Sequence, residues 1–95
     1  MANYVARTHT VYAYNWGGED KASVSSFLRG RGVEIVDFLV VARPGRMACF
    51  EGDSIALVIG RRVMRAQRGD WLVFSDSGAV LVMQDDHFQS MFTAV

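Results

Sequence analysis

The sequence predicts an α+β protein, in which a twisted antiparallel β-sheet of about five or six strands is packed by one principal helix, with a short C-terminal helical turn. Two observations predict this class. Segments whose residues alternate with a two-residue period outnumber the segments with helical periodicity. The connections between the alternating segments are too short for the crossovers that a parallel sheet needs, so neighbouring strands should run antiparallel.

The first third of the chain predicts one strand and the principal helix. Residues 4–14 alternate and are rich in β-branched and aromatic types, so they predict a single strand. The glycines of "NWGGED" predict a turn, and the segment after it begins with acidic residues and ends with arginines and glycines, as helices do. A helix over about residues 20–29 would direct four apolar side chains toward a core: Ala22, Val24, Phe27 and Leu28.

The middle of the chain predicts further strands. Residues 33–43, "VEIVDFLVVAR", predict a strand, and "RPGR" at residues 43–46 predicts a reverse turn, because proline restricts one dihedral and glycine frees the next. The segment "MACFEGDSIALVIG" contains two β-prone pieces around a Gly-Asp turn. Residues 61–67 alternate again, and the inward side of this strand should carry Met64 and Ala66.

The segments "DWLVFS" and "AVLVMQ" predict a β-hairpin. They are separated by "DSG", in which glycine can adopt the positive φ that closes the turn. The alternation places Leu72 and Phe74 on one face of the hairpin and Trp71 and Val73 on the other. Trp71 starts the hairpin and should be largely buried.

The segment "DDHFQSMF" predicts the short helical turn near the C-terminus. Asp85 or Asp86 would cap its first turn, because a carboxylate accepts hydrogen bonds from free backbone N–H groups there. Phe88 and Phe92 are four residues apart and therefore lie on one face. We expect that face to dock this turn on the sheet.

Composition limits the organisation of the chain and its partners. Its 95 residues predict a single domain, 1–95, with a thin core, and 51% of them are hydrophobic. So large an apolar fraction is difficult to bury within one protomer, so we expect a homo-oligomer. Ten basic residues balance ten acidic ones, which argues against general nucleic-acid binding and against a membrane partner.

Three features indicate a soluble protein of a reducing compartment. Cys49 is the single cysteine, so there is no intrachain disulfide and no thiolate metal site. The N-terminus lacks the apolar segment of a secretory signal. The longest apolar runs, such as "FLVVA" and "IALVI", are too short to span a bilayer. We expect the protein in the cytoplasm.

The C-terminal half carries a pattern that spans the predicted hairpin and helical turn, made of Met64, Gly69, Asp70, Trp71, Gly78, Phe88 and Phe92. With "VYAYNWGGED" and "SSFLRG" upstream, it resembles a family of small phage and prophage proteins of unknown function. The resemblance implies a viral origin, and hence the host cytoplasm, but no activity. The family has proline where Arg68 stands, an acidic-glycine turn where Arg61 and Arg62 stand, and tyrosine where Phe92 stands.

None of the short motifs predicts catalysis, a cofactor or a metal. The Arg68-Gly69-Asp70 triplet leads into a strand and reads as a turn, not as an exposed adhesion ligand. The cluster Asp85-Asp86-His87 would need a distant third ligand such as His9. Cys49 has no adjacent base that could activate it as a nucleophile. The segment "FSDSG" does not match the Gly-x-Ser-x-Gly turn that carries the nucleophile of a hydrolase, and "WGGED" lacks the glycine spacing of a phosphate-binding loop.

Binding is therefore the expected role, and the expected partner-binding residues are Arg61, Arg62, Arg65 and Trp16. The arginines repel one another unless solvent or an acidic partner receives them, while Trp16 is either an exposed anchor or a plug in the core. The main hypothesis is a phage accessory protein that binds, and could inhibit, a host protein. The alternatives are a binder of an anionic small molecule such as a nucleotide signal, whose phosphates arginines would clamp, and a virion or assembly component.

Overall fold

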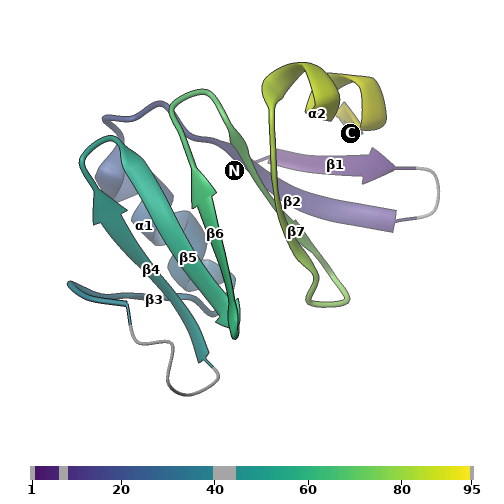
Figure 1. The fold of residues 1–95 in the computed structure, drawn as a ribbon. Helices are drawn as coiled ribbons and strands as arrows, with labels where there is room; N and C mark the ends of the chain where they lie inside the picture. The colour runs from purple at the N-terminus through teal and green to yellow at the C-terminus, as the bar shows by residue number, and fades with distance from the viewer. Residues whose placement is uncertain (1, 7–8, 40–44, 95) are drawn as a thin grey trace.

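The computed structural model of the chain describes residues 2–6, 9–39 and 45–94. In these residues the fold contains two helices, α1 (Lys21–Gly30) and α2 (Asp85–Met91), and two β-sheets (Figure 1). The strands are β1 (Ala2–Ala6), β2 (His9–Asn15), β3 (Glu34–Ile35), β4 (Gly45–Glu51), β5 (Ser54–Gly60), β6 (Arg62–Ala66), β7 (Trp71–Ser75), β8 (Val80–Met83) and β9 (Thr93–Ala94). The predicted α+β class is confirmed.

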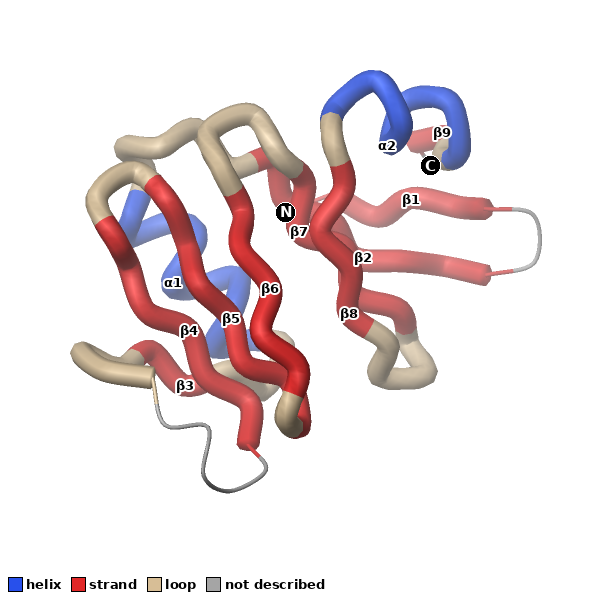
Figure 2. The backbone as a smooth tube through the Cα atoms, in the orientation of Figure 1, coloured by secondary structure: helices blue, strands red, loops and turns tan. Residues whose placement is uncertain are grey.

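The strands form two sheets where the sequence predicted one. The first sheet has the order β8-β7-β2-β1-β9, and the second has the order β3-β4-β5-β6 (Figure 2). Neighbouring strands run antiparallel except for β3 and β4, which are parallel. The expectation of a purely antiparallel sheet was wrong at this pair. Because β3 has only two residues, the chain has to travel back only about 7 Å before β4 can run parallel to it, and no helical crossover is needed.

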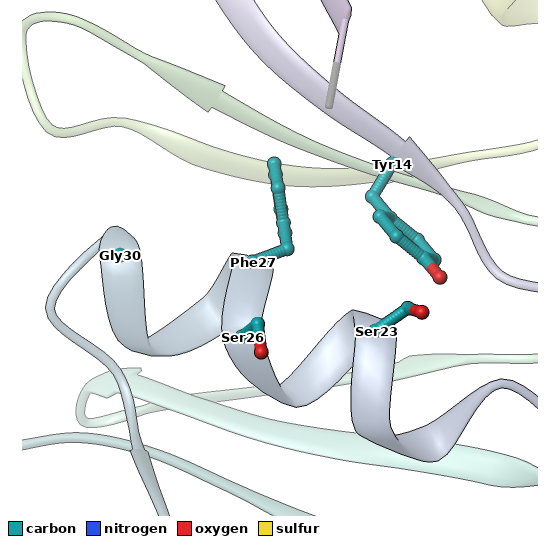
Figure 3. A pocket seen from close by; sticks show the side chains of 5 residues that line it. All are labelled: Tyr14, Ser23, Ser26, Phe27 and Gly30. Atoms are coloured by element: carbon teal, nitrogen blue, oxygen red, sulfur yellow. The ribbon is translucent and has the colours of Figure 1, made fainter.

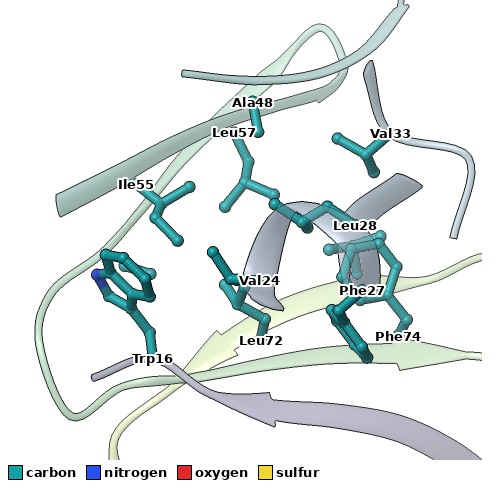
Figure 4. Close-up of a cluster of buried hydrophobic side chains, with 12 residues drawn as sticks. Trp16, Val24, Phe27, Leu28, Val33, Ala48, Ile55, Leu57, Leu72 and Phe74 are labelled. Atoms are coloured by element: carbon teal, nitrogen blue, oxygen red, sulfur yellow. The ribbon is translucent and has the colours of Figure 1, made fainter. Parts of the chain in front are cut away.

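The main core surrounds α1, which lies between the inner faces of the two sheets (Figures 1 and 4). Val24, Phe27 and Leu28 on α1 are buried, as predicted, whereas Ala22 is exposed. At 3.6 residues per turn, Ala22 lies on the side of the helix away from Val24, and for this reason its predicted inward position was wrong. The sheets contribute buried side chains to the same core: Ala48, Ile55, Leu57, Ala66, Leu72, Phe74 and Val80.

A second, smaller core lies on the opposite face of the first sheet, under α2. The Trp71 and Phe88 rings stack there with their centroids 3.9 Å apart, and Phe92 stacks on Phe88 at 4.9 Å. The predicted register of the β7–β8 hairpin is confirmed, because Trp71 and Val73 face this core while Leu72 and Phe74 face α1.

The predicted cap of α2 was wrong. Gln84 occupies the N-cap position and makes no side-chain capping bond, so Asp85 and Asp86 belong to the first turn itself. There they interact favourably with the positive end of the helix dipole. Asp85 has a further contact, because its Oδ1 accepts a hydrogen bond from Trp71 Nε1 at 2.8 Å.

The single strand predicted over residues 4–14 is two strands. β1 and β2 pair antiparallel with Ala6 opposite His9, and residues 7–8 between them lie outside the described part of the chain. The segment contains neither glycine nor proline, so its alternation continues without a turn signal. The sequence therefore could not reveal where the strand divides.

Of the strand predicted over residues 33–43, residues 40–43 lie outside the described part of the chain, and the described residues 33–39 contain a strand of only two residues. Only Glu34–Ile35 form β3, and Phe38 lies in a bend with 81% of its surface exposed. Of the reverse turn predicted at residues 43–46, Gly45 and Arg46 belong to β4, and the other two residues lie outside the described ranges. The later turns are confirmed, including the Gly-Asp turn between β4 and β5.

Two loops distant in sequence are held together by backbone hydrogen bonds. Trp16 N donates to Asp70 O at 2.8 Å, and Gly69 N donates to Trp16 O at 2.7 Å. The Arg68-Gly69-Asp70 triplet thus forms a turn that enters β7, as predicted. Gly18 lies against the Arg68 side chain with φ +90°, and a Cβ on it would lie 2.6 Å from Arg68 Nε. The positive φ favours glycine there, whereas the exposed end of the Arg68 side chain could shift to accommodate a Cβ.

Candidate functional site

The predicted arginine cluster lies on and beside β6, which is an edge strand of the second sheet as described. Arg61 stands in the turn between β5 and β6, and Arg62 and Arg65 belong to β6. All three side chains are exposed. Val63, between Arg62 and Arg65, is 45% exposed, so the strand presents an apolar group among its cations.

The two arginines of β6 point to opposite faces of the sheet. Arg62 is opposite Ile59, which packs against the α1 core, so Arg62 shares the inner face. Arg65 is opposite Ala56 and lies on the outer face. The two-residue period of the segment predicts this division. The cluster is therefore continuous along the strand but is not gathered on one face.

On the outer face, Arg65 forms an ion pair that crosses β5. Arg65 Nε lies 3.1 Å from Glu51 Oε1 on β4, and β5 runs between these two strands. Ala56 on β5 is opposite Arg65 and is fully buried, and its small side chain leaves room for the arginine to pass. Both charged side chains are about half exposed, so the pair contributes little to stability, roughly 0–1 kcal/mol.

Trp16 is a core residue and not an exposed anchor. Its relative exposure is 0%, and its ring lies 5.8 Å from the Phe50 ring at the edge of the α1 core (Figure 4). Its Nε1 donates to the Asp53 carbonyl oxygen at 2.7 Å. Of the two roles that the sequence left open, the core plug is observed, so Trp16 does not belong to a partner-contacting surface.

A second pair of arginines, which the sequence analysis did not single out, lines a cavity of about 240 Å³ near the C-terminal end of α1. Arg31 is the C-cap residue of α1, and Arg46 belongs to β4. The Arg31 guanidinium carbon lies 4.1 Å from the Tyr12 ring centroid, and Arg46 Nη2 donates to the Arg31 carbonyl oxygen at 3.1 Å. The other lining residues are Gly30, Phe74, Ser75, Asp76 and Gly78.

A neighbouring cavity of about 390 Å³ opens between α1 and β2. It is lined by Tyr14, Phe27, Ser23, Ser26 and Gly30 (Figure 3). The two serines and Gly30 follow one another along the same side of α1, and the Tyr14 and Phe27 rings stand 5.4 Å apart. Gly30 lines both cavities, so the two are adjacent.

The Tyr14 hydroxyl donates a hydrogen bond to Asp20 Oδ2, at the residue that precedes α1. Burial, then the hydrogen bond to the Asp20 carboxylate and the charge of that carboxylate, together raise the pKa of Tyr14 to about 12, against a smaller lowering by Ser23. The neutral phenol is therefore favoured in the folded state. Asp20 also accepts a bond from Gly17 N at 3.3 Å, so one carboxylate joins β2, the turn and the helix start.

This phenol should make stability fall at alkaline pH. An unfolded tyrosine loses its proton near pH 10, whereas the folded protein retains that of Tyr14 up to about pH 12. The contribution of Tyr14 to the free energy of unfolding is therefore complete below about pH 10 and is lost as the pH rises through 12. Urea unfolding should show that the free energy of unfolding of the wild type declines between about pH 9 and pH 12, and we expect this decline to be smaller in Tyr14→Phe. Equal slopes for the two proteins would contradict this assignment.

The other residues considered for chemistry are separated in the fold. Cys49 is buried, and its Sγ contacts the Asp37 carbonyl oxygen at 3.2 Å. His87 is exposed on α2, and its backbone N donates to Asp86 Oδ1 at 2.9 Å. Within the described ranges, no three His, Cys, Asp or Glu side chains lie close enough to hold a metal ion. Likewise, no helix there has the length and apolar character to cross a membrane.

The fold and the two arginine sites thus define an α+β protein with a cationic edge strand and an arginine-lined cavity. Comparisons of the chain with protein-family models, with curated proteins and with solved structures find no match.

Proposed function

We propose that this chain is a non-enzymatic phage accessory protein that binds a host protein in the host cytoplasm. The contact surface, called here the β6 surface, consists of Arg61, Arg62, Val63 and Arg65. One observation carries the proposal: an exposed apolar side chain stands among three exposed arginines, two on an edge strand and one in the turn before it. The viral origin rests on the sequence resemblance, and self-association of the chain belongs to the same proposal.

The electrostatics of the β6 surface favour an acidic partner. Arg65 has Glu51 as a partner, but Arg61 and Arg62 form no ion pair with any residue that the structure describes. Clustered guanidiniums repel one another, and carboxylates on a partner would relieve this repulsion with charge-assisted, bidentate hydrogen bonds. Arginine is also enriched among the residues that dominate binding energy at interfaces.

Charge reversal on β6 tests the proposal. Tagged wild-type protein should capture one stoichiometric host protein from host cells, and the Arg62→Glu/Arg65→Glu variant should not capture it. With the purified partner, the variant should associate more slowly, and the difference should be largest at low salt, where electrostatic steering is strongest. Its melting temperature should change little, because exposed charges contribute little to stability.

Two controls separate the β6 surface from general charge effects. Arg29→Glu reverses an exposed arginine of α1 and should leave capture unchanged. The exchange Glu51→Arg/Arg65→Glu retains the ion pair and the net charge but moves the cation to β4, and it should weaken capture. A folded double-reversal variant that still binds the partner fully would refute the β6 surface as the contact site.

A further inference from the structure

Arg31 and Arg46 form a cationic site that the β6 surface does not include. Both side chains line the same cavity, and their Nε atoms are buried without a hydrogen-bond partner in the protein. Among the described residues, neither arginine makes an ion pair with a carboxylate. Each guanidinium lies over an aromatic ring, Arg31 over Tyr12 at 4.1 Å and Arg46 over Phe74 at 5.9 Å.

Two partly buried guanidiniums on one cavity are unfavourable unless an anion pairs with them, and in the part of the chain that the structure describes Asp76, which lines the same cavity, forms no ion pair with either arginine. Burial removes hydration from each charge, and the two like charges repel in a medium of reduced dielectric. The sheet register adds a third cation nearby, because Arg46, Ile59 and Arg62 lie side by side across β4, β5 and β6 on the inner face. An anion with several oxygens would accept hydrogen bonds from both guanidiniums at once.

We propose that this cavity binds the phosphate group of a small phosphate monoester, whose uncharged part occupies the neighbouring cavity beside Tyr14 and Phe27. Arginine matches phosphate geometry because its planar fork donates two parallel hydrogen bonds. The neighbouring cavity supplies two aromatic rings, and the Ser23 and Ser26 side chains line it (Figure 3). Rings and hydroxyls together suit a planar, polar group such as a nucleobase with its sugar.

Because Gly30 has no side chain, the junction between the two cavities is open. It lines both of them, and a Cβ built on it meets no heavy atom within 4 Å. One ligand can therefore extend from the arginines to the aromatic rings. Because Gly30 is the last residue of α1, a larger side chain there would obstruct the junction without disrupting the helix.

Asp76 offers a second way to recognise the site. It lines the arginine cavity and is exposed, and its carboxylate would repel a bound phosphate. Asp76→Asn should therefore bind phosphate several-fold more tightly than the wild type. A purely structural role for Arg31 and Arg46 would not produce this increase.

Calorimetric titration at low salt tests the proposal, with adenosine monophosphate, inorganic phosphate and adenosine as probes. We expect saturable binding of adenosine monophosphate and weaker binding of inorganic phosphate. Adenosine should bind at least about tenfold more weakly than the monophosphate. Arg31→Gln and Arg46→Gln should each reduce monophosphate affinity by about tenfold or more. Gly30→Leu should reduce the affinity for the monophosphate far more than the affinity for inorganic phosphate.

Matched variants keep the test decisive. Arg29→Gln neutralises the neighbouring exposed arginine, which lines neither cavity, and should bind like the wild type. Arg46→Lys retains the charge and should retain part of the affinity even if Arg46→Gln folds poorly. Absence of binding by both phosphate-containing probes, or unchanged affinity in folded Arg31→Gln and Arg46→Gln, would overturn the site. Equal affinities for phosphate and the monophosphate would overturn the assignment of the second cavity.

Discussion

Replacing Trp16 by alanine is expected to lower the free energy of unfolding by about 3–5 kcal/mol, the usual range for truncating a large buried aromatic side chain. Trp16 has no exposed surface and is the largest fully buried side chain of the described core. Its removal would leave a cavity beside Phe50 and would deprive the Asp53 carbonyl oxygen of the Nε1 donor at 2.7 Å. Urea unfolding monitored by circular dichroism measures the change.

The Trp16→Phe variant separates the two contributions. Phenylalanine retains most of the buried ring but cannot donate to Asp53, so its loss of stability should be smaller, about 1–2 kcal/mol. Trp16→Ala should also abolish the slow hydrogen exchange of the Gly69 amide, which donates to the Trp16 carbonyl oxygen. A Trp16→Ala protein that melts within about a degree of the parent would show that Trp16 is not required by the core.

Replacing Trp71 by alanine should also cost about 3–5 kcal/mol, through the second core. The Trp71 ring stacks on Phe88 with a centroid distance of 3.9 Å and an interplanar angle of 7°. It connects β7 to α2 again through the hydrogen bond from its Nε1 to Asp85 Oδ1. The variant should therefore release α2 from the sheet, which proteolysis near the C-terminus and the midpoint of urea unfolding would both detect.

Two milder variants identify what Trp71 contributes. Trp71→Phe can still stack on Phe88 but loses the Nε1 donor, and Asp85→Ala loses the acceptor while leaving the ring in place. Each should cost about 1–2 kcal/mol, less than Trp71→Ala. If Trp71→Ala were no less stable than Asp85→Ala, the ring stack would not be what holds α2.

Features that depend on neighbouring residues in the sequence could be predicted from the sequence. The α1 helix was predicted to within one residue at each end, because its charges and glycines mark where it begins and ends. The β7–β8 hairpin and the inward position of Met64 and Ala66 follow from the two-residue period. The same period already separated Arg62 from Arg65, so the division of the arginine cluster between two faces was contained in the sequence.

Features that depend on distant parts of the chain were decided by the tertiary structure alone. Trp16 follows a strand and precedes two glycines, a context equally suited to a surface loop, and only its packing into the α1 core, with Nε1 bonded to the Asp53 carbonyl oxygen, makes it a core residue.

Arg31 and Arg46 show the same limit for the candidate anion site. Their sequence neighbours mark a helix end and a turn, and only the packing of α1 against the sheets brings them to one cavity. The sequence by itself determined periodicity, helix ends and turns, since these follow from the dihedral preferences and spacing of adjacent residues. The tertiary structure decided which side chains are buried and which cations meet, since burial and electrostatic interaction depend on distance in space, whatever the separation along the chain.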